Sequence, residues 1–279
     1  MKTGNVHLHY ESELTDIEDQ GNSVAAIIRN TRAGDTSSFV GSYLVGTDGS
    51  KSTARKLAGI QFPGHTWKER LIAMAIIISF TFMSPLKQPI PEEKSLPEVC
   101  GSDTIRRCRP EELTRDETLY TFFEEVLSDP RSFDIWIKER SVYRTHQRLA
   151  TTIRKRYCPL TGDASHSNNP YGAMGVPPGI LDVGSLADAR LMILLEGKSN
   201  YLLTPWSDAR RKVFQYFLDP LTTATLLRLK YPTAASAATD DYFFQGRQNP
   251  TPDTLVKEGR PFLEVWGTDM RALAQGYDV

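Results

Sequence analysis

LTGDASHSNNPYGAMGVPPGILDVGSLAD, the stretch Leu160–Asp188, contains the series of features that decides the fold. A short apolar run ends in a carboxylate, a turn-rich loop follows, and a helical pattern then begins; the residues that mark these points are Gly162-Asp163, Pro170, Gly172, Gly175 and Pro177-Pro178. A carboxylate accepts hydrogen bonds from ribose hydroxyls, glycines let backbone N–H groups approach a ligand, and a helix start presents unpaired N–H donors. The order therefore suits a phosphorylated, hydroxyl-rich cofactor. Glycine spacing alone leaves open a plain surface strand–turn–helix in which Asp163 caps the helix.

A second motif lies upstream in Tyr43–Phe62, YLVGTDGSKSTARKLAGIQF. An apolar strand is expected to end at Asp48-Gly49, and a helix that ends near Gly59 is expected to follow. Taken alone, the pattern is also that of an ordinary strand, Asp-Gly turn and helix, with Ser50 or Ser52 as the helix cap.

Together the two motifs resemble those of the flavin-dependent aromatic hydroxylases, the single-component monooxygenases that use NAD(P)H. The first is similar to the family's second FAD-contacting motif, GDAAH-x-x-x-P-x-G-G-x-G-x-N-x-G-I-x-D-A-x-x-L-A. The positions in register are Gly162, Asp163, Ala164, His166, Pro170, Gly172, Gly175, Gly179, Ile180, Asp182, Leu186 and Ala187. The upstream motif is similar to G-A-D-G-x-x-S-x-V-R-x-x-L-G-I, which lies near the pyrophosphate and the nicotinamide path. The resemblance is closest to the phenol-hydroxylase-like subset common in fungal secondary metabolism.

The resemblance implies an FAD-dependent monooxygenase that hydroxylates an aromatic or polyketide-type small molecule with NAD(P)H and O2, in secondary metabolite biosynthesis. It implies three groups of cofactor-binding residues: Asp163 and Gly162 at the FAD ribose, the backbone of Pro170, Gly172, Gly175 and Val176 at the flavin edge, and Asp48 and Gly49 at the pyrophosphate or nicotinamide side. Arg144 and Arg148 could orient anions, but a structural role is expected for both. No catalytic residue is assigned, because the family's substrate-deprotonating residue often comes from a part that is missing or altered here.

The chain also departs from the family pattern. It contains no G-x-G-x-x-G, the fingerprint of the βαβ unit with which the family begins, so the N-terminal part of a typical member is expected to be absent. Ala173 stands where a glycine is usual, Pro177-Pro178 removes N–H donors, and Pro159 removes a donor from an expected central strand. Two hypotheses therefore stand: a monooxygenase, or a truncated, inactive remnant that needs a partner chain to hold FAD. A non-hydroxylating flavoprotein reductase fits the loop before Gly179 less well.

The expected fold is a mixed α/β (α+β) one: an incomplete FAD-binding Rossmann-like domain, a reduced β-sheet substrate domain and C-terminal helices. The expected parts are 1–66 with the Asp-Gly motif, 67–143 with the reduced sheet, 144–230 with the second motif and helices, and a tail at 231–279. The expected strands are Val6–Tyr10, Ser23–Arg29, a buried Leu71–Met83 and Phe133–Tyr143. The expected helices are Leu119–Leu127, Ile180–Leu195, one or two within Leu202–Leu229, and a short one near Asp240–Gln245. Ser84–Pro110 and most of the chain after Pro232 are expected to lack regular structure. Arg210-Arg211 is expected on a polar helix face, and Trp206, Phe214, Tyr216 and Phe217 in the core.

Composition narrows the classes of partner. The 279 residues carry a formal net charge of −1, which gives no field to attract nucleic acid or anionic lipid. The three cysteines include no CxxC, and His7 and His9 lack an obvious third ligand, so no metal site is expected. No secretory signal is visible in Met1–Glu13, and the apolar run Leu71–Met83 is too short to span a bilayer. We expect a cytoplasmic protein with a small-molecule substrate and without stable membrane insertion; the sequence does not define its oligomeric state.

Overall fold

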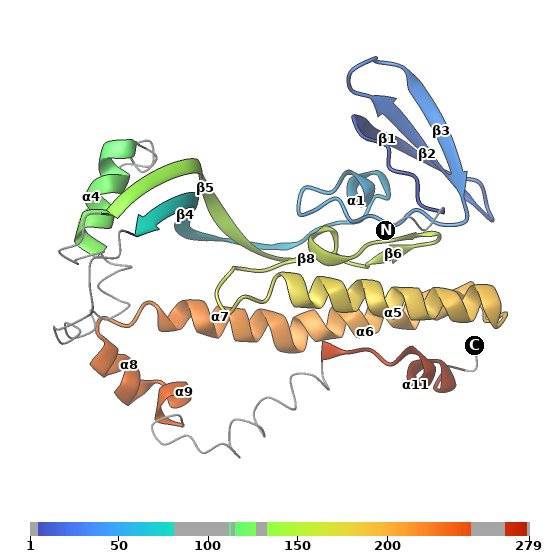
Figure 1. Ribbon diagram of the computed structural model, residues 1–279. Helices are drawn as coiled ribbons and strands as arrows, with labels where there is room; N and C mark the ends of the chain where they lie inside the picture. Colours follow the sequence, from blue (N-terminus) through green and yellow to red (C-terminus); the bar gives the residue numbers. More distant parts are fainter. Residues whose placement is uncertain (1–4, 81–111, 113–114, 127–132, 247–265, 278–279) are drawn as a thin grey trace. The chain divides into compact units, whose positions relative to one another are not determined.

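The computed structural model describes residues 5–80, 112, 115–126, 133–246 and 266–277 (Figure 1). The chain divides into two compact units. The larger unit comprises 1–65, 146–223 and 253–279, and the smaller unit comprises 66–145 and 224–252. The larger unit contains both motifs.

The larger unit begins with a three-stranded antiparallel sheet of β1 (Ser12–Asp19), β2 (Val24–Asn30) and β3 (Thr36–Gly41), in the order β1-β2-β3. The apolar start of β2 is buried, which confirms the strand predicted at Ser23–Arg29. The strand predicted at Val6–Tyr10 is wrong. The turn at Gly21, where φ is +87°, sets a register that pairs Asp19 with Val24 and places the strand after Tyr10. The apolar side chains of the 6–10 segment stay 69–79% exposed.

A short parallel strand pairing then positions the motifs. After β3 the chain runs beside a hairpin of β6 (Arg154–Lys155) and β7 (Cys158–Pro159). Gly46 donates its N–H to the Pro159 carbonyl at 2.9 Å and accepts from Thr161 N at 3.0 Å. Gly46 and Leu160 form a parallel bridge, so the two segments run in the same direction. The helix α1 (Thr53–Leu57) follows the first segment and ends before Gly59, as predicted.

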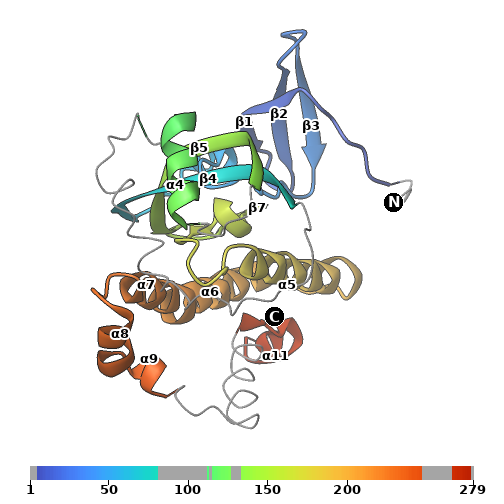
Figure 2. The same cartoon turned by 60° about the vertical axis from the view of Figure 1, so that its left-hand side comes forward.

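The helical layer of the larger unit is built on α5 (Val176–Leu195), which confirms the helix predicted at Ile180–Leu195. After the short 3-10 turn η2 (Asn200–Leu202), three elements follow one another without a break: α6 (Leu203–Val213), the π-helical turn η3 (Phe214–Leu218) and α7 (Asp219–Arg228). In both views α5 and α6 lie side by side (Figures 1 and 2). Met270 and Ala274 of α11 (Met270–Gln275) join their apolar core.

Two predictions about the α6 region are wrong. Arg210, expected on a polar face, is buried, whereas its neighbour Arg211 is half-buried and donates to the Ala150 carbonyl at 3.1 Å. Trp206 and Phe214 are buried as expected and Phe217 is half-buried, but Tyr216 is exposed. The buried positions recur every four residues, and Tyr216 lies off that stripe.

α5 is apolar on both of its faces. Leu186, Ala189 and Met192 lie in the core. The opposite face carries large apolar side chains that are 50–77% exposed, namely Val176, Ile180, Val183, Leu191, Leu194 and Leu195. The helix therefore has one packed face and one apolar face that the described residues leave uncovered.

The smaller unit contains most of the long strands β4 (Gly64–Phe80) and β5 (Phe133–Leu149), which pair in a sheet of order β4-β5-β8, where β8 is His166–Ser167. The predicted strand at Leu71–Met83 is confirmed as far as Phe80. Its predicted burial is wrong for residues 71–75, which are half-buried or exposed. The predicted loop Ser84–Pro110 lies outside the described residues.

Helices complete the smaller unit. α4 (Asp116–Val126) confirms the helix predicted at Leu119–Leu127. Beyond Pro232, α9 (Tyr242–Gln245) confirms the short helix predicted near Asp240–Gln245, whereas α8 (Ala234–Asp240) was not predicted. Arg228 forms an ion pair with Asp241 at 3.0 Å, and both side chains are 9% exposed. Across the described part of the chain, no helix combines the length and apolarity needed to cross a bilayer.

Candidate functional site

Both motifs leave the parallel strand pair at the same edge. Since Gly46 and Leu160 pair in parallel, the residues that follow them, Asp48-Gly49 and Gly162-Asp163, emerge at the carboxyl ends of the two segments. Ligands of open α/β sheets bind outside the carboxyl ends of the strands. The fold thus brings the two predicted motifs, more than a hundred residues apart in sequence, to one edge.

A buried arginine ties the two motifs together. Arg55, in α1, donates from Nη1 to the Ala164 carbonyl and from Nη2 to the Ser50 carbonyl, both at 2.7 Å. Its guanidinium lies 3.7 Å from the centre of the Phe62 ring. In the sequence, Arg55 could be recognised only as a position of the upstream motif. Its structural role depends on the Ala164 carbonyl, which lies far along the chain.

The Leu160–Asp188 motif begins with a tight turn against α5. Gly162–Ala164 forms the 3-10 turn η1, in which Gly162 has a φ of +57°. A Cβ on Gly179 would lie 3.3 Å from the Gly162 Cα, so the start of α5 lies directly against η1. Gly162 also donates its N–H to Asp182 Oδ2 at 3.1 Å. Glycine at 179 allows this close approach of the two backbones, and glycine at 162 suits the positive φ of the turn.

Asp163 occupies the exposed side of this turn. No residue within the described ranges donates a hydrogen bond to its carboxylate. The alternative that Asp163 caps the following helix is wrong, because α5 begins at Val176 with Gly175 at the N-cap position and no side-chain cap. The carboxylate is therefore available to a ligand.

The loop between η1 and α5 is anchored at its base and exposed at its tip. Asn169 is fully buried; its N–H donates to Gln147 Oε1 at 3.0 Å, and its own Oδ1 accepts from Tyr171 N at 3.1 Å. Pro170, Gly172, Gly175 and Val176 are exposed. Ala173 adopts a φ of +56°, the left-handed conformation that glycine adopts more readily, in agreement with the glycine usual there.

Asp48 lies in the turn before α1 and is bound to the start of that helix. Its carboxylate accepts from Ser52 Oγ at 2.5 Å, Thr53 N at 2.6 Å and Ala54 N at 3.0 Å. Partial burial raises its pKa, but these hydrogen bonds outweigh that effect and hold the pKa below its ordinary value. Ser52 is the N-cap of α1, one of the two caps predicted. Gly49, in contrast, has a φ of +78° and open space where a side chain would lie.

Other candidates in the sequence do not form a site. His7 and His9 lie outside any strand, and no group of three or more His, Cys, Asp or Glu side chains in the described ranges could hold a metal ion. Arg148 has a structural contact, a hydrogen bond to the Phe62 carbonyl at 3.2 Å. Cys158 is buried, which raises the pKa of its thiol to about 11.

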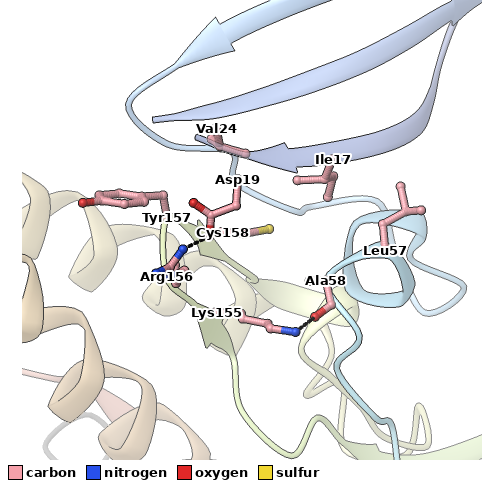
Figure 3. A pocket seen from close by; sticks show the side chains of 9 residues that line it. All are labelled: Ile17, Asp19, Val24, Leu57, Ala58, Lys155, Arg156, Tyr157 and Cys158. Carbon is pink, nitrogen blue, oxygen red and sulfur yellow. Dashed lines mark hydrogen bonds and ion pairs between the residues drawn. The ribbon is translucent and has the colours of Figure 1, made fainter. Parts of the chain in front are cut away.

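Figure 3 shows a pocket of about 150 Å³ between the β1–β2 hairpin, the end of α1 and the β6–β7 hairpin. Ligand pockets usually measure about 300–1,000 Å³. Its two cations already have partners: Lys155 donates to the Ala58 carbonyl at 2.7 Å and Arg156 pairs with Asp19 at 2.5 Å. This pocket is too small for a dinucleotide, and the residues predicted from the motifs do not line it.

Comparison with known proteins agrees with the two motifs. The family model described as "FAD binding domain" matches residues 1–220. Para-nitrophenol 4-monooxygenase of Pseudomonas sp. (strain WBC-3) is 30% identical over 261 residues, which are 86% of this chain and 62% of that relative. A putative polyketide hydroxylase of Streptomyces halstedii is 26% identical over 74% of this chain and 40% of its own length.

The fold is also that of a solved structure, p-nitrophenol 4-monooxygenase PnpA of Pseudomonas putida DLL-E4. The TM-score is 0.72 at 24% identity, over 92% of this chain and 67% of that one. The chain thus spans about three fifths of the first curated relative. The family match over most of its length, together with both motifs at one edge of the parallel strand pair, assigns the chain: it belongs to the FAD-binding domain family.

Proposed function

We propose that this chain provides the flavin-binding part of a monooxygenase that hydroxylates an aromatic or polyketide-type small molecule with NAD(P)H and O2, in secondary metabolism. The observation that carries the proposal is the exposed carboxylate of Asp163, which has no hydrogen-bond partner among the described residues, at the edge where both motifs end. The aromatic and polyketide substrates named for the relatives support the substrate class.

The residues around Asp163 fit part of FAD. A carboxylate free of internal partners suits vicinal ribose hydroxyls, each of which can donate to it. The exposed residues Pro170, Gly172 and Gly175 belong to the loop that joins η1 to α5, and the exposed Val176 is the first residue of α5. We assign these residues, with Gly162, to the ribose and the flavin edge. Pro177 and Pro178 supply no N–H, so the remaining donors of the helix start are those of neighbouring residues.

In the Asp48-Gly49 motif we assign the cofactor contact to the glycine backbone, whereas in the Gly162-Asp163 motif we assign it to the carboxylate as well. The Asp48 carboxylate holds the start of α1 through its three hydrogen bonds. Because this carboxylate is negatively charged, it would repel a diphosphate bound beside it. We therefore assign the phosphate or nicotinamide side to the open backbone of Gly49, with Asp48 fixing the turn.

Bound FAD would supply electron transfer from NAD(P)H and activation of O2. The chain's own residues hold and orient it. Asp163 fixes the ribose, and the positive end of the α5 dipole favours negative charge at the flavin edge. No residue that touches substrate is assigned.

The second candidate function is a chain that binds FAD only together with another polypeptide. It is favoured by one observation in the sequence, the lack of a G-x-G-x-x-G that would hold the pyrophosphate on a helix N-terminus. The apolar face of α5 that the described residues leave exposed is consistent with it.

A flavin fluorescence titration of two matched variants tests the Asp163 assignment. Asp163→Asn removes the charged acceptor, whereas Asp188→Asn removes an exposed carboxylate on α5 itself. Losing charge-assisted hydrogen bonds of about 1.5–3 kcal/mol weakens binding about 10- to 150-fold. We expect that loss for Asp163→Asn and wild-type affinity for Asp188→Asn. Equal affinity of both variants would show that Asp163 does not contact the cofactor.

A further inference from the structure

A buried ionic cluster lies behind the Asp163 turn. It consists of His166, Asp182 and Arg210, which we call the Asp182 cluster; the side chains are 3%, 0% and 1% exposed. Charged groups this deeply buried are costly unless every charge is paired and hydrogen-bonded. The cluster contacts the turn that carries Asp163, because Gly162 donates its N–H to Asp182.

Asp182 connects three elements through one carboxylate. Oδ1 accepts from Arg210 Nε of α6 at 2.6 Å. Oδ2 contacts His166 Nε2 of β8 at 2.8 Å and accepts from the backbone of Gly162 in η1 at 3.1 Å. Burial raises the pKa of Asp182, but His166 and Arg210 outweigh it, so the pKa lies below its ordinary value and the group is ionised.

The geometry also defines the proton on His166. Its Nδ1 is buried and has no hydrogen-bond partner among the described residues, and its ring packs 5.4 Å from that of Phe214. A proton on Nε2 satisfies this environment, since Nε2 can then donate to Asp182 Oδ2, whereas a proton on Nδ1 would have no acceptor among the described residues. His166 therefore donates to Asp182 from Nε2, and the ion pair of Arg210 with Asp182 brings opposite charges together beside it.

Arg210 extends the cluster to the start of α5. Its Nη2 donates to the carbonyl of Pro178, in the first turn of the helix, at 3.3 Å. Its Nη1 donates to the Trp266 carbonyl and to Thr268 Oγ1, so residues 266–268 are held as well. The two parts of the proposed site, the Asp163 turn and the first turn of α5, thus depend on the same ion pair.

We infer that the Asp182 cluster positions the cofactor-binding loop, by fixing η1 and the first turn of α5 relative to each other before FAD arrives. Its members are positioning residues and do not touch the cofactor. This inference rests on the proposed function. Preorganisation lowers the ordering cost of binding, so loss of the cluster weakens FAD binding even in a chain that remains folded. A cluster that served stability alone would leave the affinity of the folded chain unchanged.

The matched pair Asp182→Asn and Asp241→Asn separates the two roles. Each variant removes the charge of a buried Asp–Arg pair, and the Arg228–Asp241 pair lies in the smaller unit. For Asp182→Asn we expect the FAD dissociation constant to rise about tenfold or more, and amide hydrogen exchange to become faster in residues 162–182. For Asp241→Asn we expect faster exchange near 228–245 and an FAD affinity within about twofold of wild type.

A second pair avoids the risk that Asp182→Asn fails to fold. His166→Gln keeps an N–H donor for Asp182, and His166→Leu does not. We expect the Gln variant to bind FAD nearly as the wild type does and the Leu variant to lose about tenfold. Wild-type FAD affinity in a folded Asp182→Asn or His166→Leu variant would overturn the inference, whether or not exchange at 162–182 becomes faster. A wild-type chain that binds no FAD would instead refute the proposed function, while hydrogen exchange would still test whether the cluster holds the turn.

Discussion

Gly46→Ala should separate the two segments that bring the motifs to one edge. A Cβ at this position would lie 2.6 Å from Leu160 Cδ2 and 2.9 Å from Ala54 Cβ, far inside van der Waals contact. Both neighbours are buried in the core, so neither can move into open space. Overpacking of this kind costs about 1–3 kcal/mol. With about 2–4 °C lost per kcal/mol, Tm should fall by roughly 2–12 °C.

Thermal unfolding followed by circular dichroism measures this loss, and Gly184→Ala is the control. Gly184 lies inside α5, and nothing lies within 4 Å of its would-be Cβ. The same substitution should there stabilise the helix by about 0.5–1 kcal/mol and raise Tm. Equal Tm values for Gly46→Ala and the wild type would refute the close packing of the parallel pair, and with it the placement of both motifs at one edge.

Three further predictions follow from individual residues. The pKa values of Asp48 and Asp182 are lowered on folding, so both ionised carboxylates stabilise the fold above the unfolded-state pKa of 3.8 and lose this effect as pH falls through the lower folded pKa. Urea unfolding between pH 7 and 3 should show a declining free energy of unfolding, and the decline should be smaller in Asp182→Asn. Cys158 should resist a thiol reagent at pH 7 in the folded chain and react only on unfolding, because its pKa is about 11 and it is buried; rapid labelling of the native chain would contradict its burial. Ala173→Gly should remove about 1 kcal/mol of backbone strain, because Ala173 adopts a left-handed conformation, and the greater entropy of an unfolded glycine should offset part of this gain. A lower Tm than that of the wild type would argue against this loop conformation.

The local signals in the sequence predicted the turns and helix starts of the candidate site. Glycines and prolines fix turns and helix starts through their own backbone preferences, so the loop after Asp163 and the start of α5 could be predicted without knowledge of the fold. The Asp-Gly turn and the cap at Ser52 could be predicted for the same reason. The family assignment made from these residues is confirmed by the match over residues 1–220.

The errors concern features that depend on distant partners. Arg210 was predicted to face solvent because charged residues usually lie on the polar face of a helix. In the structure it is buried, and it donates hydrogen bonds to Asp182 and to the Pro178 carbonyl of α5. The strand predicted at Val6–Tyr10 has suitable alternation, yet the turn at Gly21 pairs a later and more polar segment. Asp182 and His166 were visible only as motif positions, because nothing in the sequence shows that they meet.

The central claim is that these residues hold FAD. The most direct test is an absorbance scan of the purified chain between about 300 and 500 nm, after incubation with FAD and desalting. The account predicts retained flavin bands in the wild-type chain and their loss in Asp163→Asn. A wild-type chain that emerges colourless would contradict the claim that it holds FAD unaided and would favour binding together with another polypeptide.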